Sequence, residues 1–147
     1  MIDSKRKGAN YERKVVRYIN SKLKNGKFKK VAGSGAIGTI EGEPYLMGDI
    51  NGIVEGFNRR FKLEAKVGYG GSKQIALKKI WLDKIKEQAE YTQAIPAVIC
   101  RFSNARSGVE EFVAMDLDDF IDLLNYVTQK EEIIQFLTQE LEECEDE

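Results

Sequence analysis

Two carboxylates and a lysine are spaced in this sequence in a way that could hydrolyse phosphodiester bonds. Asp49 comes fifteen residues before the tripeptide Glu64-Ala65-Lys66. In a strand, Glu64 and Lys66 would lie on one face, because successive strand residues point to opposite faces. A hairpin that turns near Phe57 would pair positions whose numbers sum to roughly 114, which brings Asp49 close to Glu64 and Ala65.

This grouping has the parts that phosphodiester hydrolysis requires. Carboxylates hold a divalent cation, which neutralises phosphate charge and lowers the pKa of a bound water. A lysine can hold the attacking water or stabilise the transition state. Because the sequence has no histidine, a metal would be held by oxygen ligands, which favours Mg²⁺ with Mn²⁺ as a substitute. The alternative is an ordinary ion pair on a solvated face, since an isolated Glu-x-Lys is very common.

The elements that would position these residues follow from hydrophobic periodicity. We predict helices over residues 8–24, 75–92 and 116–143, the last as two helices or as one with a break near Thr128. We predict strands over residues 27–32, 47–55, 59–67, 96–102 and 109–114, with a hairpin turn around Gly56-Phe57-Asn58. A Gly-rich loop from Gly33 to about Tyr45 precedes the hairpin. The order is that of an α/β fold, a mixed central β-sheet flanked by helices.

Charge divides the chain into two parts. Residues 1–106 carry 22 Lys and Arg against 10 Asp and Glu, whereas residues 107–147 carry one Lys against 14 acidic residues. We therefore predict a core over residues 1–106, followed by an acidic strand and helical extension over 107–147 that packs on the same domain. The basic part, including Lys5-Arg6-Lys7, predicts a polyanionic partner such as DNA. The alternative is a solvated surface with an acidic tail for solubility.

Other features limit the compartment and the chemistry. No apolar run approaches the roughly 18 residues of a membrane span, and the basic start has no apolar stretch after it. We therefore expect a cytoplasmic protein without a membrane partner. Cys100 and Cys144 are too few for a disulfide framework. Gly33 to Gly38 formally fits GxGxxG, but Thr39 to Pro44 cannot form the helix that a dinucleotide site needs, so we expect no small-molecule cofactor.

Two further segments resemble a known family. They are Lys7-Gly8-Ala9-Asn10-Tyr11-Glu12-Arg13 and Val31-Ala32-Gly33-Ser34-Gly35. With the element order, they resemble the archaeal-type Holliday junction resolvases of the PD-(D/E)XK nuclease superfamily, over roughly residues 5–102. The resemblance implies a restriction-endonuclease-like fold and a Mg²⁺-dependent endonuclease of DNA recombination and repair. It also implies a homodimer, in which each subunit supplies one active site, so that paired nicks release a four-way DNA junction.

The resemblance also implies roles for individual residues. The implied catalytic residues are Glu12, Ser34, Asp49, Glu64 and Lys66. The implied metal ligands are Asp49, Glu64 and the carbonyl of Ala65, with Glu12 completing or supporting the site. Arg13, Lys30 and Lys79 match positions that hold the DNA backbone. The sequence departs from the pattern in having Gly48 rather than proline before Asp49, and in its long loop from Gly33 to Met47.

Three questions stay open from the sequence. A PD-(D/E)XK nuclease with another substrate, of the replication or restriction type, would share every catalytic residue. A non-catalytic branched-DNA-binding module would keep the fold alone. The helical segment 116–143 could pack on the core, extend a dimer interface or compete with DNA for the basic face.

Overall fold

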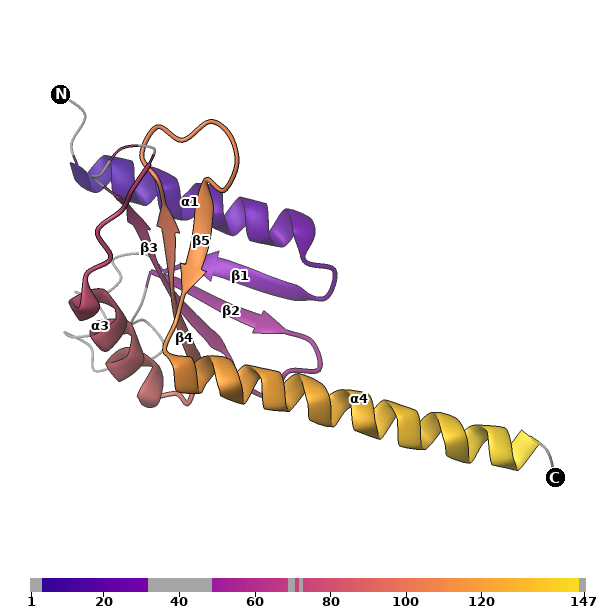
Figure 1. Ribbon diagram of the computed structural model, residues 1–147. Coiled ribbons are helices and arrows are strands. Elements are labelled where there is room, and N and C mark those ends of the chain that lie inside the picture. Colours follow the sequence, from indigo (N-terminus) through magenta and orange to yellow (C-terminus); the bar gives the residue numbers. More distant parts are fainter. Residues whose placement is uncertain (1–3, 32–48, 69–70, 72, 146–147) are drawn as a thin grey trace. The chain divides into compact units, whose positions relative to one another are not determined.

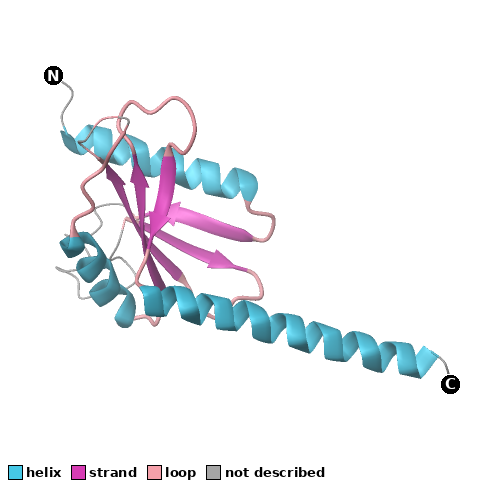
Figure 2. Ribbon diagram, in the orientation of Figure 1, coloured by secondary structure: helices cyan, strands magenta, loops and turns pink. Residues whose placement is uncertain are grey.

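The computed structural model describes residues 4–31, 49–68, 71 and 73–145, which form two compact units, residues 1–115 and 116–147. The first unit is a five-stranded mixed sheet with helices on both faces (Figure 1, Figure 2). Its elements are α1 (Ser4–Lys22), β1 (Gly26–Lys30), β2 (Ile50–Val54), β3 (Phe61–Val67), α3 (Lys79–Glu90), β4 (Ile95–Arg101) and β5 (Glu111–Ala114). The predicted fold class is confirmed, and the elements that the structure describes follow one another in the predicted order.

The strands lie in the order in which they occur along the chain, β1 to β5. Every neighbouring pair is antiparallel except β3 and β4, which are parallel and are connected through α3. This connection is long enough for a crossover, as a parallel pair requires. Helix α1 is tied to the edge strand β1 by Asn20, whose side chain donates to the Phe28 carbonyl and accepts from the Phe28 N–H, both at 2.9 Å.

Each face of the sheet has its own apolar core. On one face, α1 supplies Tyr11 and Val15 to a buried cluster that also contains Phe28, Ile50, Leu63, Ala65, Ala97 and Ile99. On the other face, α3 supplies Ile85 to a smaller cluster with Val98 and Cys100. Odd and even positions of β3 and β4 therefore face different helices, as period-2 alternation requires.

Two glycines permit the β2–β3 hairpin and its packing. Gly56 has a φ of 80°, a left-handed conformation that glycine adopts without strain, and it lies in the predicted turn. Gly52 pairs with Phe28 of β1, and a Cβ at Gly52 would collide with the Phe28 ring. Ile50 pairs with Leu63, so paired positions sum to 113, one less than expected.

The helices differ from the prediction at their ends. Helix α1 begins at Ser4 rather than at residue 8, and α3 begins at Lys79 rather than at residue 75. The segment before α3 is not helical. Ile75, which lies in this segment, packs against the core on the α3 side and against Gly68. Ile75 therefore fits the helical spacing of apolar residues, although its backbone is not part of α3.

The second unit is one helix, α4 (Leu117–Glu145), of 29 residues. It has no break at Thr128, whose hydroxyl donates to the Leu124 carbonyl at 3.0 Å within the helix. Because β5 pairs with β4, residues 111–114 belong to the sheet, and the two units divide after Met115 rather than after residue 106, where the charge changes sign. Among the described residues, no helix is both long and apolar enough to cross a membrane.

Candidate active site

Asp49 and Glu64 come together at the point where β2 stops pairing with β3. The last pair of this ladder is Ile50 with Leu63, and the next two positions are Asp49 and Glu64. The N–H of Ala65 lies beyond the ladder, and it donates to Oδ2 of Asp49 at 3.2 Å. The Asp49 carboxylate thus takes the place of a backbone acceptor and is held beside the middle of β3.

Glu64 is a buried carboxyl group with a second carboxylate close by. Its exposed fraction is 6%, because it lies on the side of β3 that α3 covers. Burial raises the pKa of Glu64, the negative charge of Asp49 raises it further, and Lys66 and Lys84 oppose this shift. A buried carboxyl group beside a second carboxylate is the kind of site that a cation stabilises.

Lys66 lies two residues further along the same face of β3. Its Nζ forms an ion pair with Oε1 of Glu64 at 2.5 Å. Burial acts to lower the pKa of Lys66, but the hydrogen bond and charge of Glu64, with the charges of Asp49 and Glu12, raise it overall. Lys66 therefore carries its proton at neutral pH, which suits it to stabilise negative charge or to orient a water rather than to accept a proton.

Glu12 of α1 approaches this group without joining the carboxylate pair. Its Oε2 accepts from Nζ of Lys30 at 2.7 Å, so the two residues connect α1 to β1. Glu12 is near enough to Lys66 to raise its pKa. Within the described part of the chain, however, no three acidic, cysteine or histidine side chains form a metal-binding group. The carboxylates available together are those of Asp49 and Glu64.

Helix α3 adds two residues that the sequence reasoning did not include. The ring centroid of Trp81 lies 5.8 Å from Nζ of Lys66, and the charge of Lys84 acts on Glu64. Trp81 and Lys84 are three residues apart and so share one face of the helix. Their spacing was readable in the sequence, but only the packing of α3 shows that this face covers the site.

Lys62 is a buried lysine on the same face as Glu64 and Lys66. Its exposed fraction is 2%, and burial, with a smaller effect from the charge of Arg60, lowers its pKa to about 8. The alternation of residues along β3 places these three charged residues on one face. The face is polar in composition, but α3 covers it, and Lys62 and Glu64 are buried.

The remaining predicted residues lie at the surface or outside the described residues. Arg13 donates to Oδ1 of Asn10 at 2.9 Å along α1, and both residues are exposed. Lys79 forms an ion pair with Asp83 at 2.7 Å one helical turn along α3. Arg6 and Lys7 are exposed on α1, and the side chain of Lys5 is outside the described residues. Ser34 and the predicted loop from Gly33 to about Tyr45 also lie outside them.

The arrangement has the donor chemistry of a divalent-cation site. The carboxylates of Asp49, just before β2, and of Glu64 in β3, with the carbonyl of Ala65, are hard oxygen ligands of the kind that Mg²⁺ and Mn²⁺ take. Burial first, and the charge of Asp49 second, raise the pKa of Glu64 even with Lys66 bound to it, so a further positive charge here would favour the charged carboxylates. These residues therefore fit a divalent cation.

Comparison with known proteins relates this chain to a nuclease family. A family described as phage putative PDDEXK endonuclease matches residues 3–146, nearly the whole chain. No curated protein and no solved structure matches. The matched range includes both units and all the residues of the site.

Proposed function

Because the chain belongs to this phage PDDEXK endonuclease family and is a nuclease of the PD-(D/E)XK superfamily, we propose that it cuts four-way DNA junctions with bound Mg²⁺. The observation that carries the proposal is the convergence of Asp49, Glu64 and Lys66 on one face of the sheet. Two carboxylates and a protonated lysine at one place are the chemistry that phosphodiester hydrolysis needs.

Each residue of the site has a distinct part in the proposed reaction. The carboxylates of Asp49 and Glu64, with the carbonyl of Ala65, would hold the cation. Such an ion, when bound, would supply a water of lowered pKa and neutralise charge on the phosphate. The ammonium of Lys66 holds the attacking water or stabilises charge that develops on the phosphate. Glu12 supports the site through its electrostatic effect on Lys66.

The DNA is held by its backbone in this proposal. Exposed lysines and arginines on α1 and β1 give a basic surface on the same unit as the site. They are Arg6, Lys7, Arg13, Lys14, Arg17, Lys22, Lys27 and Lys29. Cations of this kind contact phosphates whatever the base sequence, so shape would decide the substrate. The resemblance of the α1 segment Lys7–Arg13 to the junction resolvases supports branched DNA over linear duplex.

A homodimer follows from the proposed substrate. Release of a four-way junction requires two nicks, and each chain has one set of Asp49, Glu64 and Lys66. A dimer would supply two sites to one junction. Equilibrium sedimentation of the full chain tests this, and a monomer at the concentrations where the protein cuts junctions would contradict it.

The function is tested with a synthetic immobile four-way junction and a linear duplex of the same sequence, each with Mg²⁺, with Mn²⁺ and with chelator. We expect paired nicks in the junction alone, with either metal and not with chelator. Equal cutting of the duplex would support the proposed active site but would show that the substrate is DNA in general. Binding without cutting in both metals would contradict the nuclease and leave a DNA-binding module.

A further inference from the structure

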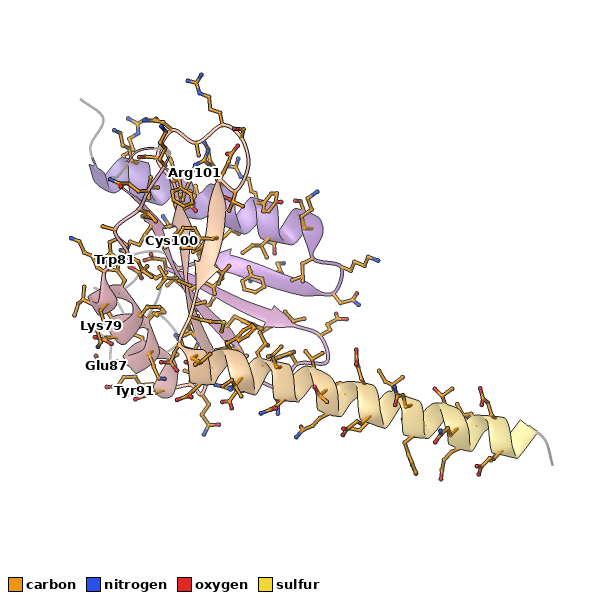
Figure 3. All side chains as sticks on the ribbon, in the orientation of Figure 1. Lys79, Trp81, Glu87, Tyr91, Cys100 and Arg101 are labelled. Atoms are coloured by element: carbon orange, nitrogen blue, oxygen red, sulfur yellow. The ribbon has the colours of Figure 1, made fainter. Side chains whose placement is uncertain are left out.

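Trp81 lies in the first turn of α3, and its indole ring is set against the core on that side of the sheet. The ring is half-buried and packs against the cluster of Ile85, Val98 and Cys100. Figure 3 shows Trp81 near the N-terminal end of α3, with Tyr91 at the other end of the helix. Because core side chains are close-packed, the ring has a fixed position relative to β4.

The ammonium group of Lys66 lies between this ring and the Glu64 carboxylate. Lys66 pairs in register with Cys100, so its stem starts directly over the cluster on which Trp81 packs. Its Nζ is 5.8 Å from the ring centroid and 2.5 Å from Oε1 of Glu64. An ammonium within about 6 Å of an indole centroid is attracted by the negative face of the ring, more strongly where both are withdrawn from water.

We propose that Trp81 is a positioning residue that holds the ammonium of Lys66 at the site of reaction. Lysine has a flexible stem and a compact charge, so it needs partners to keep it in one place. In the proposed function, on which this inference rests, Glu64 also binds the cation, so its oxygens are shared between Lys66 and the metal. The ring of Trp81 would then give Lys66 a contact that does not depend on the oxygens of Glu64.

The kinetic test compares Trp81→Leu with Trp81→Phe, and uses Tyr91→Leu as the matched control. Tyr91 is an exposed aromatic residue at the opposite end of α3. We expect Trp81→Leu to lower kcat about two- to thirtyfold, the loss of a cation–π contact that is partly withdrawn from water, with little change in KM for DNA. Phe keeps a ring, so Trp81→Phe should recover most of kcat. Tyr91→Leu should cut at the wild-type rate.

A spectroscopic test does not depend on cleavage. Trp81 is the single tryptophan of the chain, so its emission reports on this ring alone. We expect Lys66→Met to change the emission intensity of the metal-free protein, because it removes one of the two cations that lie over the ring, the other being Nζ of the exposed Lys78 at 6.0 Å. Lys130→Met, a lysine of α4, is the control and should leave the emission unchanged.

The outcomes separate this inference from the proposed function. An unchanged kcat in Trp81→Leu, or an unchanged emission in Lys66→Met, would overturn it. If Trp81→Leu does not fold, the kcat of Trp81→Phe and the emission of Lys66→Met still test whether Trp81 holds the ammonium of Lys66. If the wild-type protein cuts no DNA while Lys66→Met changes the emission, the contact stands and the nuclease function fails.

Discussion

Replacing Asp49 by Ala and by Asn separates the two roles of its carboxylate, as a negative charge and as a hydrogen-bond acceptor. Its charge acts on Glu64, and its Oδ2 accepts the N–H of Ala65 at 3.2 Å. Both substitutions remove the charge. Only Asn keeps an oxygen that can accept from Ala65, which is itself buried at 8% exposure. The comparison of the two variants therefore tests the hydrogen bond to Ala65.

The magnitude follows from what each variant leaves behind. An N–H buried without an acceptor costs about 1–3 kcal/mol, so Asp49→Ala should be less stable than Asp49→Asn by about that amount. Asp49→Asn removes both the repulsion between Asp49 and Glu64 and the attraction between Asp49 and Lys66, so without metal its stability should stay near that of the wild-type protein. Neither variant should cut DNA or gain stability from Mg²⁺.

Urea denaturation in the presence of a chelator measures these differences, provided that the dependence on denaturant has the same slope in all three proteins. Repeating it with Mg²⁺ shows whether metal binding stabilises each one. Equal stability of Asp49→Ala and Asp49→Asn would refute the hydrogen bond to Ala65. A full Mg²⁺ stabilisation of Asp49→Asn, or full cleavage by it, would refute the assignment of Asp49 to the metal site.

Three further predictions follow from other features. The pKa of Glu64 is raised in the folded protein, by burial first and by Asp49 second, so the metal-free protein should lose stability as pH rises through that value. Glu64→Gln should remove this loss, measured by urea denaturation in chelator from about pH 4 to about pH 8, and an unchanged pH profile would contradict it. Cys144 is exposed, whereas Cys100 is buried and burial raises its pKa. A thiol reagent should therefore label Cys144 quickly and Cys100 only on unfolding. Mass spectrometry that found Cys100 labelled first would contradict the fold. Removing residues 116–147, which carry 12 acidic residues and one Lys, changes the net charge from −1 to +10 and leaves both apolar cores complete. The shortened chain should fold and bind DNA more tightly at low salt, with a steeper salt dependence; equal affinity in a binding titration would show that the acidic helix does not act on DNA binding.

The sequence by itself determined the centre of the site. Asp49 and Glu64 belong to a hairpin, and the register of a hairpin follows from its turn and from the alternation of apolar and polar residues. Both signals are local, so the meeting of Asp49 with Glu64 and Ala65 was predicted to within one position of register. The same alternation placed Glu64 and Lys66 on one face. The order of helices and strands was readable for a similar reason, since periodicity is a property of short segments.

Only the tertiary structure decided what covers this face. Lys62, Glu64 and Lys66 have the composition of a solvated strand face, yet α3 packs over them because β3 and β4 are parallel and the connecting helix must cross the sheet. That crossing buries Lys62 and Glu64, shifts their pKa values and brings Trp81 to Lys66. It depends on contacts between segments far apart in the chain, which no local pattern encodes. The boundary between the units was hidden in the same way, because pairing of β5 with β4, rather than the change in charge, determines where the sheet ends.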